Sequence, residues 1–213
     1  MQRFFDIIFS LLAIAILFPI LLICIVFLKL TGEGEVFYKQ LRVGQKQKLF
    51  KLIKFATMKK NSEKMGAGTL TLKNDSRVLP FGKFLRKTKI NELPQLFNIF
   101  LGSMSFVGPR PLAEKQFNHY NESQREKIAS IKPGLTGFGS IYFRDEEQIL
   151  HESSEHNADE IYKKKIAPIK AKLEQKYIEQ KNIKTYFIVL FLTFVVVVFP
   201  KSNLHIKVLN IDE

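Results

Sequence analysis

The longest uncharged stretch of the chain constrains its folding most. Residues 7–28 make a run of 22 residues without a charge, and only Ser10, Pro19 and Cys24 interrupt its aliphatic and aromatic series. About 20 apolar residues are enough for a helix to cross the core of a bilayer. A secretory signal fits less well, because Arg3 is the only leading cation and no small-x-small cleavage site follows. We therefore predict that residues 1–30 are a membrane anchor.

Pro19, near the middle of this run, leaves two arrangements open. A proline inside a helix removes one backbone hydrogen bond and kinks the helix. The kinked helix can still span the membrane, or it can break at Pro19 and return to the side from which it entered. Lys and Arg outnumber acids between residues 29 and 60, where Glu33 and Glu35 are the only carboxylates. That bias predicts a cytoplasmic location for the region after the anchor.

The charge of the whole chain limits the classes of partner. Lys and Arg number 33 against 20 Asp and Glu, a formal net charge of +13. Such an excess suits phospholipid headgroups, nucleic acid or phosphorylated substrates. A nucleic-acid binder would explain the charge but not the anchor, and no recognised nucleic-acid module is present, so we expect no nucleic-acid partner.

Periodicity predicts a mainly helical α+β fold with a small β-hairpin and amphipathic helices at the membrane interface. We divide it into a 1–30 anchor, a 31–145 cytoplasmic catalytic domain and a 146–213 charged helical segment with an apolar end. Asn91 is expected to cap a helix that Gly102 ends. The other expected elements are strands at 36–40 and 48–55, helices at 81–86 and 113–130, a strand at 140–143, a helical region at 145–182 broken near Pro168, and a short apolar helix, or alternatively a strand, at 186–199.

Cations and a carboxylate cluster in the middle of the chain. A diphosphate needs positive charge, and an arginine fork pairs bidentately with phosphate oxygens. Arg110 lies between Pro109 and Pro111, so its backbone is stiff. Lys54 and Arg86 can add charge, although most such side chains are solvated surface cations. Glu92 is either a catalytic carboxylate or an acid that complements the dipole of the following helix.

Many ordered motifs, from Arg3-Phe4-Phe5-Asp6 to about Gly137, resemble one family: the small monotopic phosphoglycosyl transferases among the bacterial sugar transferases. The motifs that carry the resemblance are the apolar run with Pro19, Val36-Phe37-Tyr38-Lys39-Gln40 with Arg42 and Gly44, Lys54-Phe55-Ala56-Thr57-Met58, Asn74-Asp75-Ser76-Arg77, Gly82-Lys83-Phe84-Leu85-Arg86, Glu92-Leu93-Pro94-Gln95-Leu96, Gly102-Ser103-Met104-Ser105, Val107-Gly108-Pro109-Arg110-Pro111 and Lys132-Pro133-Gly134-Leu135-Thr136-Gly137.

The resemblance implies a reaction and a place for it. Such enzymes move a sugar-1-phosphate from a nucleotide diphosphate sugar to a polyprenol phosphate, at the cytoplasmic face of the bacterial inner membrane, and so begin a surface glycan. It also implies a re-entrant N-terminal helix broken at Pro19 and a magnesium ion. Contact with anionic membrane lipids is expected from the positive net charge. By the same match, Glu92 is the expected catalytic carboxylate and magnesium ligand, Arg110 holds phosphate, and Lys54 and Arg86 assist. A homodimer is kept as an alternative to a monomer.

Two positions depart from the family pattern. The family's nucleophilic Asp falls on Asn91, and an amide is a very poor nucleophile. Ala56 stands where the family usually has Arg. Four readings follow: Glu92 attacks instead, another carboxylate such as Asp145 or Glu146 reaches the site, the transfer is direct between bound substrates, or the protein is an impaired homologue that binds or scaffolds. We favour catalysis, because phosphoryl transfer relies mainly on positioning and electrostatics.

Overall fold

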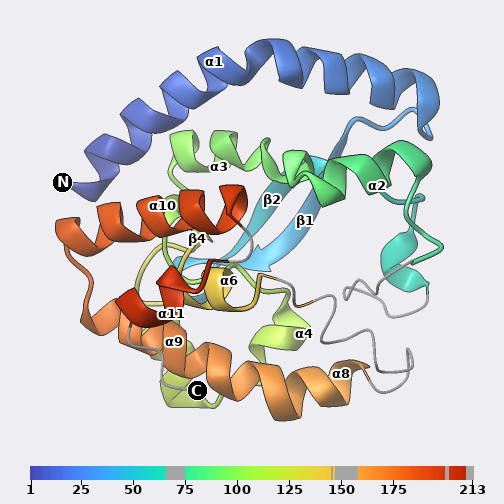
Figure 1. The fold of residues 1–213 in the computed structure, drawn as a ribbon. Helices are drawn as coiled ribbons and strands as arrows, with labels where there is room; N and C mark the ends of the chain where they lie inside the picture. The colour runs from blue at the N-terminus through green and yellow to red at the C-terminus, as the bar shows by residue number, and fades with distance from the viewer. Residues whose placement is uncertain (66–74, 145, 147–157, 200–201, 210–213) are drawn as a thin grey trace.

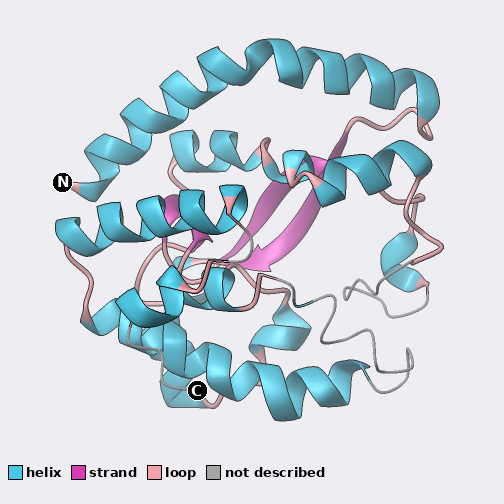
Figure 2. Cartoon of the chain, viewed as in Figure 1, coloured by secondary structure: helices cyan, strands magenta, loops and turns pink. Residues whose placement is uncertain are grey.

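The structure is a computed structural model that describes residues 1–213 except 66–74, 145, 147–157, 200–201 and 210–213 (Figure 1). Helices predominate and two small sheets accompany them, so the predicted α+β class is confirmed (Figure 2). In chain order the elements are α1 (Gln2–Thr31), β1 (Phe37–Val43), η1 (Gln45–Gln47), β2 (Leu49–Phe55), η2 (Ser62–Lys64), α2 (Pro80–Lys87), η3 (Ile90–Glu92), α3 (Gln95–Leu101), β3 (Ser105–Val107), α4 (Glu114–Phe117), α5 (Glu122–Ile128), β4 (Gly134–Thr136), α6 (Phe138–Tyr142), α8 (Ala158–Ile161), η4 (Tyr162–Ile166), α9 (Ala167–Glu179), α10 (Ile183–Val198) and α11 (Leu204–Val208).

The apolar N-terminus forms one long helix that arches over the rest of the molecule (Figure 1). Pro19 lies inside α1, and the helix continues beyond it to Thr31. The break expected at Pro19 therefore does not divide this segment into two helices. Of the helices in the described part of the chain, α1 alone is both long and apolar enough to cross a membrane.

Both ends of α1 are attached to the same body of the protein. Near the N-terminus, the Arg3 guanidinium donates to the carbonyl oxygens of Ile99 and Phe100 at the end of α3. Asp6 is buried one turn later, and its Oδ1 accepts hydrogen bonds from β3 and α10. Towards the C-terminus, Leu21, Cys24 and Leu28 pack in a buried cluster with Phe55 of β2 and Leu85 of α2. One face of α1 therefore contacts the protein along most of its length.

The predicted hairpin is confirmed as the antiparallel pair β1–β2, in which Phe37 opposes Phe55 and Val43 opposes Leu49. Residues two apart in a strand share a face, so Gln40 and Arg42 lie on the same face as each other. Helix α3 is fixed to β2 by the buried side chain of Asn98. Its Oδ1 accepts from the Ile53 amide at 2.9 Å, and its Nδ2 donates to the Lys51 carbonyl at 2.9 Å.

Gly102 ends α3 with a φ of 90°, as predicted, because this left-handed conformation suits glycine. The apolar side chains of α3 do not all face the core. Leu96 and Ile99 are buried, whereas Phe97, Phe100 and Leu101 are exposed. The helix is thus apolar on two sides, and only one of them is covered by the described residues.

A second, parallel sheet joins β3 to β4, with Ser105 opposite Gly134 and Val107 opposite Thr136. The two chains approach so closely that a Cβ on Gly134 would lie 2.1 Å from the Gly108 amide nitrogen. Only glycine fits there. The predicted strand at 140–143 is wrong, since residues 140–142 belong to helix α6. Phe138 and Ile141 are both buried three residues apart, which is a helical rather than a strand period.

The C-terminal half differs from the prediction in detail. Pro168 does not break the helical region: it lies in the first turn of α9, where a missing amide donor costs little. The helix predicted at 113–130 is two helices, because Asn121 starts α5 with a capping box.

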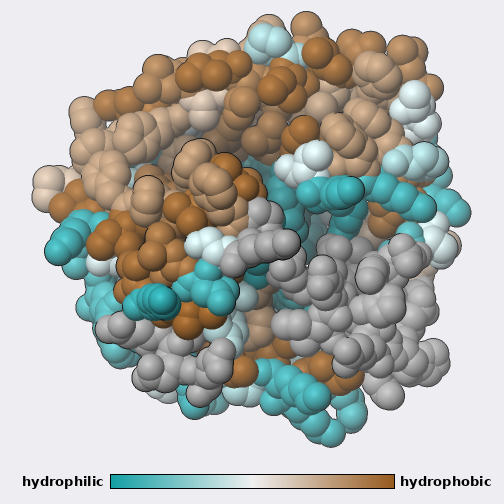
Figure 3. All heavy atoms as spheres, viewed as in Figure 1, coloured by the Kyte–Doolittle hydropathy of each residue, from teal (hydrophilic) through white to brown (hydrophobic). Residues whose placement is uncertain are grey.

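The apolar segment near the C-terminus is helix α10, which confirms the favoured reading over a strand. Its buried face includes Tyr186, Val189 and Leu192, whereas large apolar side chains cover its other face. Together with α1 they form an apolar surface, which we call the apolar band (Figure 3). The α1 and α10 members that are most clearly exposed are Phe4, Leu11, Leu12, Ile16, Phe18, Leu22, Ile23, Val26, Phe27, Leu30, Phe187, Phe191, Phe194, Val197, Val198 and Phe199.

Candidate active site

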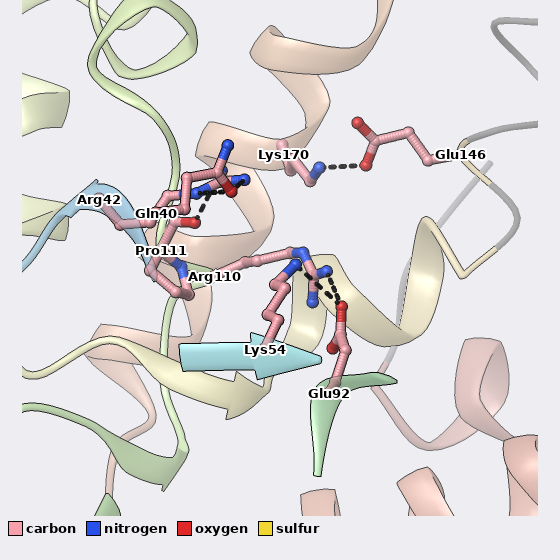
Figure 4. Close-up of polar contacts among 8 residues, drawn as sticks. All are labelled: Gln40, Arg42, Lys54, Glu92, Arg110, Pro111, Glu146 and Lys170. Atoms are coloured by element: carbon pink, nitrogen blue, oxygen red, sulfur yellow. Dashed lines mark hydrogen bonds and ion pairs between the residues drawn. The ribbon is translucent and has the colours of Figure 1, made fainter. Parts of the chain in front are cut away.

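Glu92 is the centre of a cluster of charges beside the end of β2. It lies in η3, just before α3, and the Asn98 contacts with β2 fix this segment beside Lys54. Glu92 Oε1 lies 2.9 Å from Arg110 Nη2 and 3.4 Å from Lys54 Nζ (Figure 4). The predicted association of Glu92 with Arg110 and Lys54 is therefore present in the structure, across 18 and 38 residues of sequence.

Arg110 reaches Glu92 from the turn that follows β3. Gly108 donates to the Thr136 carbonyl at 2.9 Å, and the Pro109 carbonyl accepts from Gly134 at 2.8 Å. The flanking prolines restrict φ, so the turn has little freedom to redirect the arginine. The parallel β3–β4 pair and the prolines together aim this guanidinium.

Arg42 is a site residue that sequence reasoning did not select as one. Its guanidinium donates from both Nε and Nη2 to Gln40 Oε1, and Nη1 donates to the Pro111 carbonyl at 3.3 Å (Figure 4). Arg42 therefore holds the turn that carries Arg110 and adds a third cation near Glu92. Its position on the same strand face as Gln40 was the available signal, but a strand cation is usually solvated.

The pKa shifts reflect this crowding of cations. Burial alone would raise the pKa of Glu92, but the Arg110 guanidinium and the Lys54 ammonium hold it well below its usual range. Burial, aided by the neighbouring arginines, lowers the pKa of Lys54 to about 8. Burial and Arg110 lower the pKa of Arg42 to about 10. Glu92 is thus ionised at neutral pH, and the positive charge around it exceeds its own negative charge.

The other predicted site residues are Arg86, Glu146 and Asp145, and the structure places the first two near the charge cluster. Arg86 of α2 is half-buried and close enough to lower the pKa of Lys54. Glu146 pairs with Lys170 of α9, and its charge raises the pKa of Arg110, so it borders the site without an ion pair to Arg110 (Figure 4). Asp145 lies outside the described residues.

Asn91 does not cap a helix. It is buried inside η3, α3 begins at Gln95, and its Oδ1 accepts no hydrogen bond from a described residue. This was a wrong expectation, because a short 3-10 turn precedes the helix. The residue that precedes Glu92 therefore has a buried oxygen acceptor that no described residue satisfies.

Magnesium, which the resemblance implies, needs oxygen ligands at this site. Mg²⁺ is commonly held by one or two carboxylates together with substrate phosphates. Asn91 Oδ1 is buried and has no hydrogen-bond partner among the described residues, and the contacts of Glu92 with Arg110 and Lys54 both use its Oε1. In the described part of the chain no three His, Cys, Asp or Glu side chains gather into a metal site. The donor set therefore fits a magnesium ion only if substrate oxygens complete its coordination.

Comparisons with known proteins agree with the motifs. A family model described as bacterial sugar transferase matches residues 1–200, well beyond Gly137. The chain is 41% identical to the UDP-glucose:undecaprenyl-phosphate glucose-1-phosphate transferase of Klebsiella pneumoniae over 148 residues, which are 66% of this chain and 30% of that protein. It is 35% identical over 159 residues to the exopolysaccharide production protein ExoY of Sinorhizobium fredii, 68% of this chain and 70% of the relative.

A third relative is the undecaprenyl-phosphate galactose phosphotransferase of Salmonella typhimurium. The identity is 34% over 161 residues, which cover 68% of this chain and 33% of that protein. The chain thus spans about a third of two of these relatives and 70% of the third.

Proposed function

Because the chain belongs to the bacterial sugar transferase family, we propose that it transfers a sugar-1-phosphate from a nucleotide diphosphate sugar to a polyprenol phosphate. The transfer takes place at the cytoplasmic face of the inner membrane and starts a surface glycan. Two relatives are named for transfer to undecaprenyl phosphate and one for exopolysaccharide production.

The charge cluster around Glu92 is the observation that carries this proposal. Three cations lie around the Glu92 carboxylate, namely Arg42, Lys54 and Arg110. Side chains 16–33% exposed keep these charges partly out of water, which strengthens their attraction for an anion. A diphosphate carries enough negative charge to balance the excess, and arginine forks match its oxygens.

The attachment of α1 supports an arrangement in which both ends of this helix lie on the same side of the membrane. A helix of 30 residues is about 45 Å long, which exceeds the roughly 30 Å core of a bilayer. A spanning α1 would leave its two ends on opposite sides, yet Arg3 and Leu28 both contact the same body. We therefore expect α1 to enter the cytoplasmic leaflet and return, with the apolar band among the lipids.

Asn91 and the ion pairs of Glu92 favour direct transfer between the two bound substrates. The amide cannot attack phosphorus, and Glu92 already pairs with Arg110 and Lys54. In the direct route, an oxygen of the polyprenol phosphate attacks the sugar-bearing phosphorus of the donor. The bond to the bridging oxygen breaks, and the nucleoside monophosphate leaves with that electron pair. The cations stabilise the charge that develops on the phosphoryl oxygens and the leaving group.

Magnesium is part of this proposal. Glu92 and Asn91 would hold the ion through side-chain oxygens, and the donor diphosphate and water would supply the remaining ligands. When bound, it would neutralise phosphate charge. The cations of the protein would then neutralise only part of the phosphate charge, and their main role would be to position the donor.

The decisive experiment uses the full chain purified in lipid nanodiscs with polyprenol phosphate. A panel of nucleotide diphosphate sugars is offered with Mg²⁺ or with EDTA, and release of nucleoside monophosphate is scored. We expect release with at least one donor, dependent on both the lipid phosphate and Mg²⁺. Binding of donors without any release would overturn the enzymatic function in favour of a binding or scaffold protein.

The same preparation distinguishes the routes. Direct transfer requires both substrates to be bound at once, so initial rates should follow a sequential pattern. A donor labelled on its sugar phosphate should leave no label on the protein. Ping-pong rates together with labelled protein would contradict direct transfer and point to Glu92 or another carboxylate as the nucleophile.

A further inference from the structure

The backbone of Arg110 has a single hydrogen-bond donor to fix it. Pro109 and Pro111 on either side have no amide hydrogen, so the Arg110 amide is the only donor in this three-residue stretch. The carbonyls of Pro109 and Pro111 are occupied by Gly134 and Arg42. The partner of the Arg110 amide therefore completes the restraint of the turn.

That partner is Glu174 of α9. Its Oε1 accepts from the Arg110 amide at 3.3 Å, across 64 residues of sequence. One turn later on the same helix, Tyr177 Oη donates to the Val107 carbonyl at 3.2 Å. Both side chains are at most 2% exposed. One face of α9 thus contacts the backbone of this turn at both ends.

Two glycines provide the space for the carboxylate. A Cβ on Gly139 would lie 2.5 Å from Glu174 Oε1, and one on Gly137 would lie 3.6 Å from Oε2. The start of α6 therefore packs directly on the carboxyl group. Glu174 is held against Arg110 on one side by α9 and on the other by backbone with no side chain.

Packing energy alone does not account for Glu174. Burial raises its pKa to about 7, and its Oε2 has no hydrogen-bond partner among the described residues. The nearby Lys170 ammonium pairs instead with Glu146 and lies over the rings of Phe143 and Tyr162. A buried carboxylate with incomplete pairing costs free energy relative to an apolar side chain. The hydrogen bond from the Arg110 amide is the largest of the contributions that lower the pKa of Glu174 against this burial.

We propose that Glu174 is a positioning residue, which fixes the Arg110 backbone so that the guanidinium is aimed at Glu92 and at the phosphates of the donor. The proposal rests on the proposed function for its effect on turnover, but the contact itself is independent of it. It makes α9, which lies beyond the motifs around Glu92, part of the phosphate-binding apparatus.

Substitutions at Glu174 test the role of the acceptor oxygen. In Glu174→Ala and Glu174→Met the acceptor is lost, and Met keeps most of the packing volume. We expect kcat/KM for the donor to fall about 10-fold in both, mainly through KM, since one hydrogen bond of about 1–1.5 kcal/mol is removed. Glu174→Gln retains an oxygen acceptor and should stay within about threefold of the wild type. The matched control is Glu179→Ala, an exposed acid on the same helix, which should be unchanged.

A double-mutant cycle separates positioning from general stabilisation. If Glu174 acts through Arg110, Glu174→Met should cost little further activity once Arg110→Ala has removed the guanidinium. Equal losses in the two backgrounds, or equal losses for the Gln and Met variants, would overturn the proposal and leave Glu174 with a structural role only.

Amide hydrogen exchange gives a readout that needs no turnover. The Arg110 amide stands alone between two prolines, so its exchange can be followed within a short peptide. We expect faster exchange at this amide in Glu174→Ala and Glu174→Met, and slow exchange in Glu174→Gln. Unchanged exchange in all variants would refute the contact. Altered exchange in a protein without transferase activity would instead uphold the contact and refute the proposed function.

Discussion

Glu92 is surrounded by positive charge supplied from three separate parts of the chain. Arg42 and Lys54 come from the two strands of one hairpin, and Arg110 comes from the turn after β3. An ionised carboxylate in such a place can orient cations, bind a metal ion and repel a misplaced phosphate. Its charge, rather than its size, is expected to matter.

We expect Glu92→Gln to lower kcat by about 100-fold or more, because the neutral amide no longer orients Arg110 and Lys54 by its charge. Steady-state release of nucleoside monophosphate measures the loss. Glu35→Gln is the control, since Glu35 is an exposed acid whose ion pair with Lys60 lies on the surface. Full activity of Glu92→Gln would refute the role assigned to this residue.

Lys54 gives a prediction about pH. Because burial and neighbouring cations lower its pKa to about 8, the ammonium is lost as pH rises through 8. The site then has one cation fewer, so the KM for the donor should rise between pH 7 and pH 9. Lys54→Arg keeps its charge throughout this range and should remove the rise. The KM measured at each pH for both proteins provides the test, and a rise of equal size in Lys54→Arg would exclude Lys54 as its cause.

The residue types were readable from the sequence, but their distances were not. Arg110 was identified through its prolines and Glu92 through its motif. Arg42 was overlooked as a site residue because a single strand cation has no local feature that separates it from a solvated one. Only the contact with Pro111 shows that it supports the turn.

At the scale of elements, α1 is held at its N-terminal end by a buried acid. Asp6 Oδ1 accepts hydrogen bonds from Ser105 Oγ, the Phe106 amide and Tyr186 Oη at 2.9–3.0 Å. An acid inside an apolar helix would oppose membrane insertion unless it were paired. The three donors fix the start of α1 to β3 and α10, on the same body that its far end contacts.

This attachment predicts the topology of α1. In a Cys24→Ala background, single cysteines placed at Gln2 and at Gly34 should both react with a membrane-impermeant maleimide in inverted vesicles and neither in intact spheroplasts. Both ends then lie on the cytoplasmic side. A control cysteine at the exposed Lys83 should behave like them. Reaction of the Gln2 position from the outside alone would show a spanning helix and contradict the re-entrant arrangement.

Element type was predicted best where a period was long and clear. The β1–β2 hairpin and the apolar C-terminal helix were confirmed, whereas residues 140–142 belong to helix α6 instead of the predicted strand at 140–143. Four residues give too short a pattern to separate period 2 from period 3.6, and packing of Phe138 and Ile141 decided it.

At the scale of the whole molecule, the exposed apolar side chains and the excess of basic residues suit a protein that lies against a membrane. The apolar band on α1 and α10 is far larger than scattered exposed apolar side chains would give. A net charge of +13 adds attraction for anionic headgroups. The apolar band should keep the protein bound to the bilayer even when salt screens the attraction between charges.

Replacing Phe191 and Phe194 with Asp should therefore weaken membrane association, because two charges would enter the lipid boundary from the exposed face of α10. Flotation with anionic and with neutral liposomes, at low and high salt, measures the effect. We expect less protein in the floated fraction at both salt concentrations. Unchanged flotation of the Phe variant would exclude α10 from the lipid contact.

The sequence by itself determined the local chemistry: a long apolar run with a proline, a hairpin, a rigid Pro-Arg-Pro turn, and an Asn91 where an attacking carboxylate was expected. These depend on residue type and short-range spacing. The tertiary structure decided which groups meet, namely Arg42 at the Arg110 turn, Glu174 under the Arg110 amide, and both ends of α1 on one body. Such contacts join residues up to 180 positions apart, and they arise from the packing of whole elements, which no local pattern encodes.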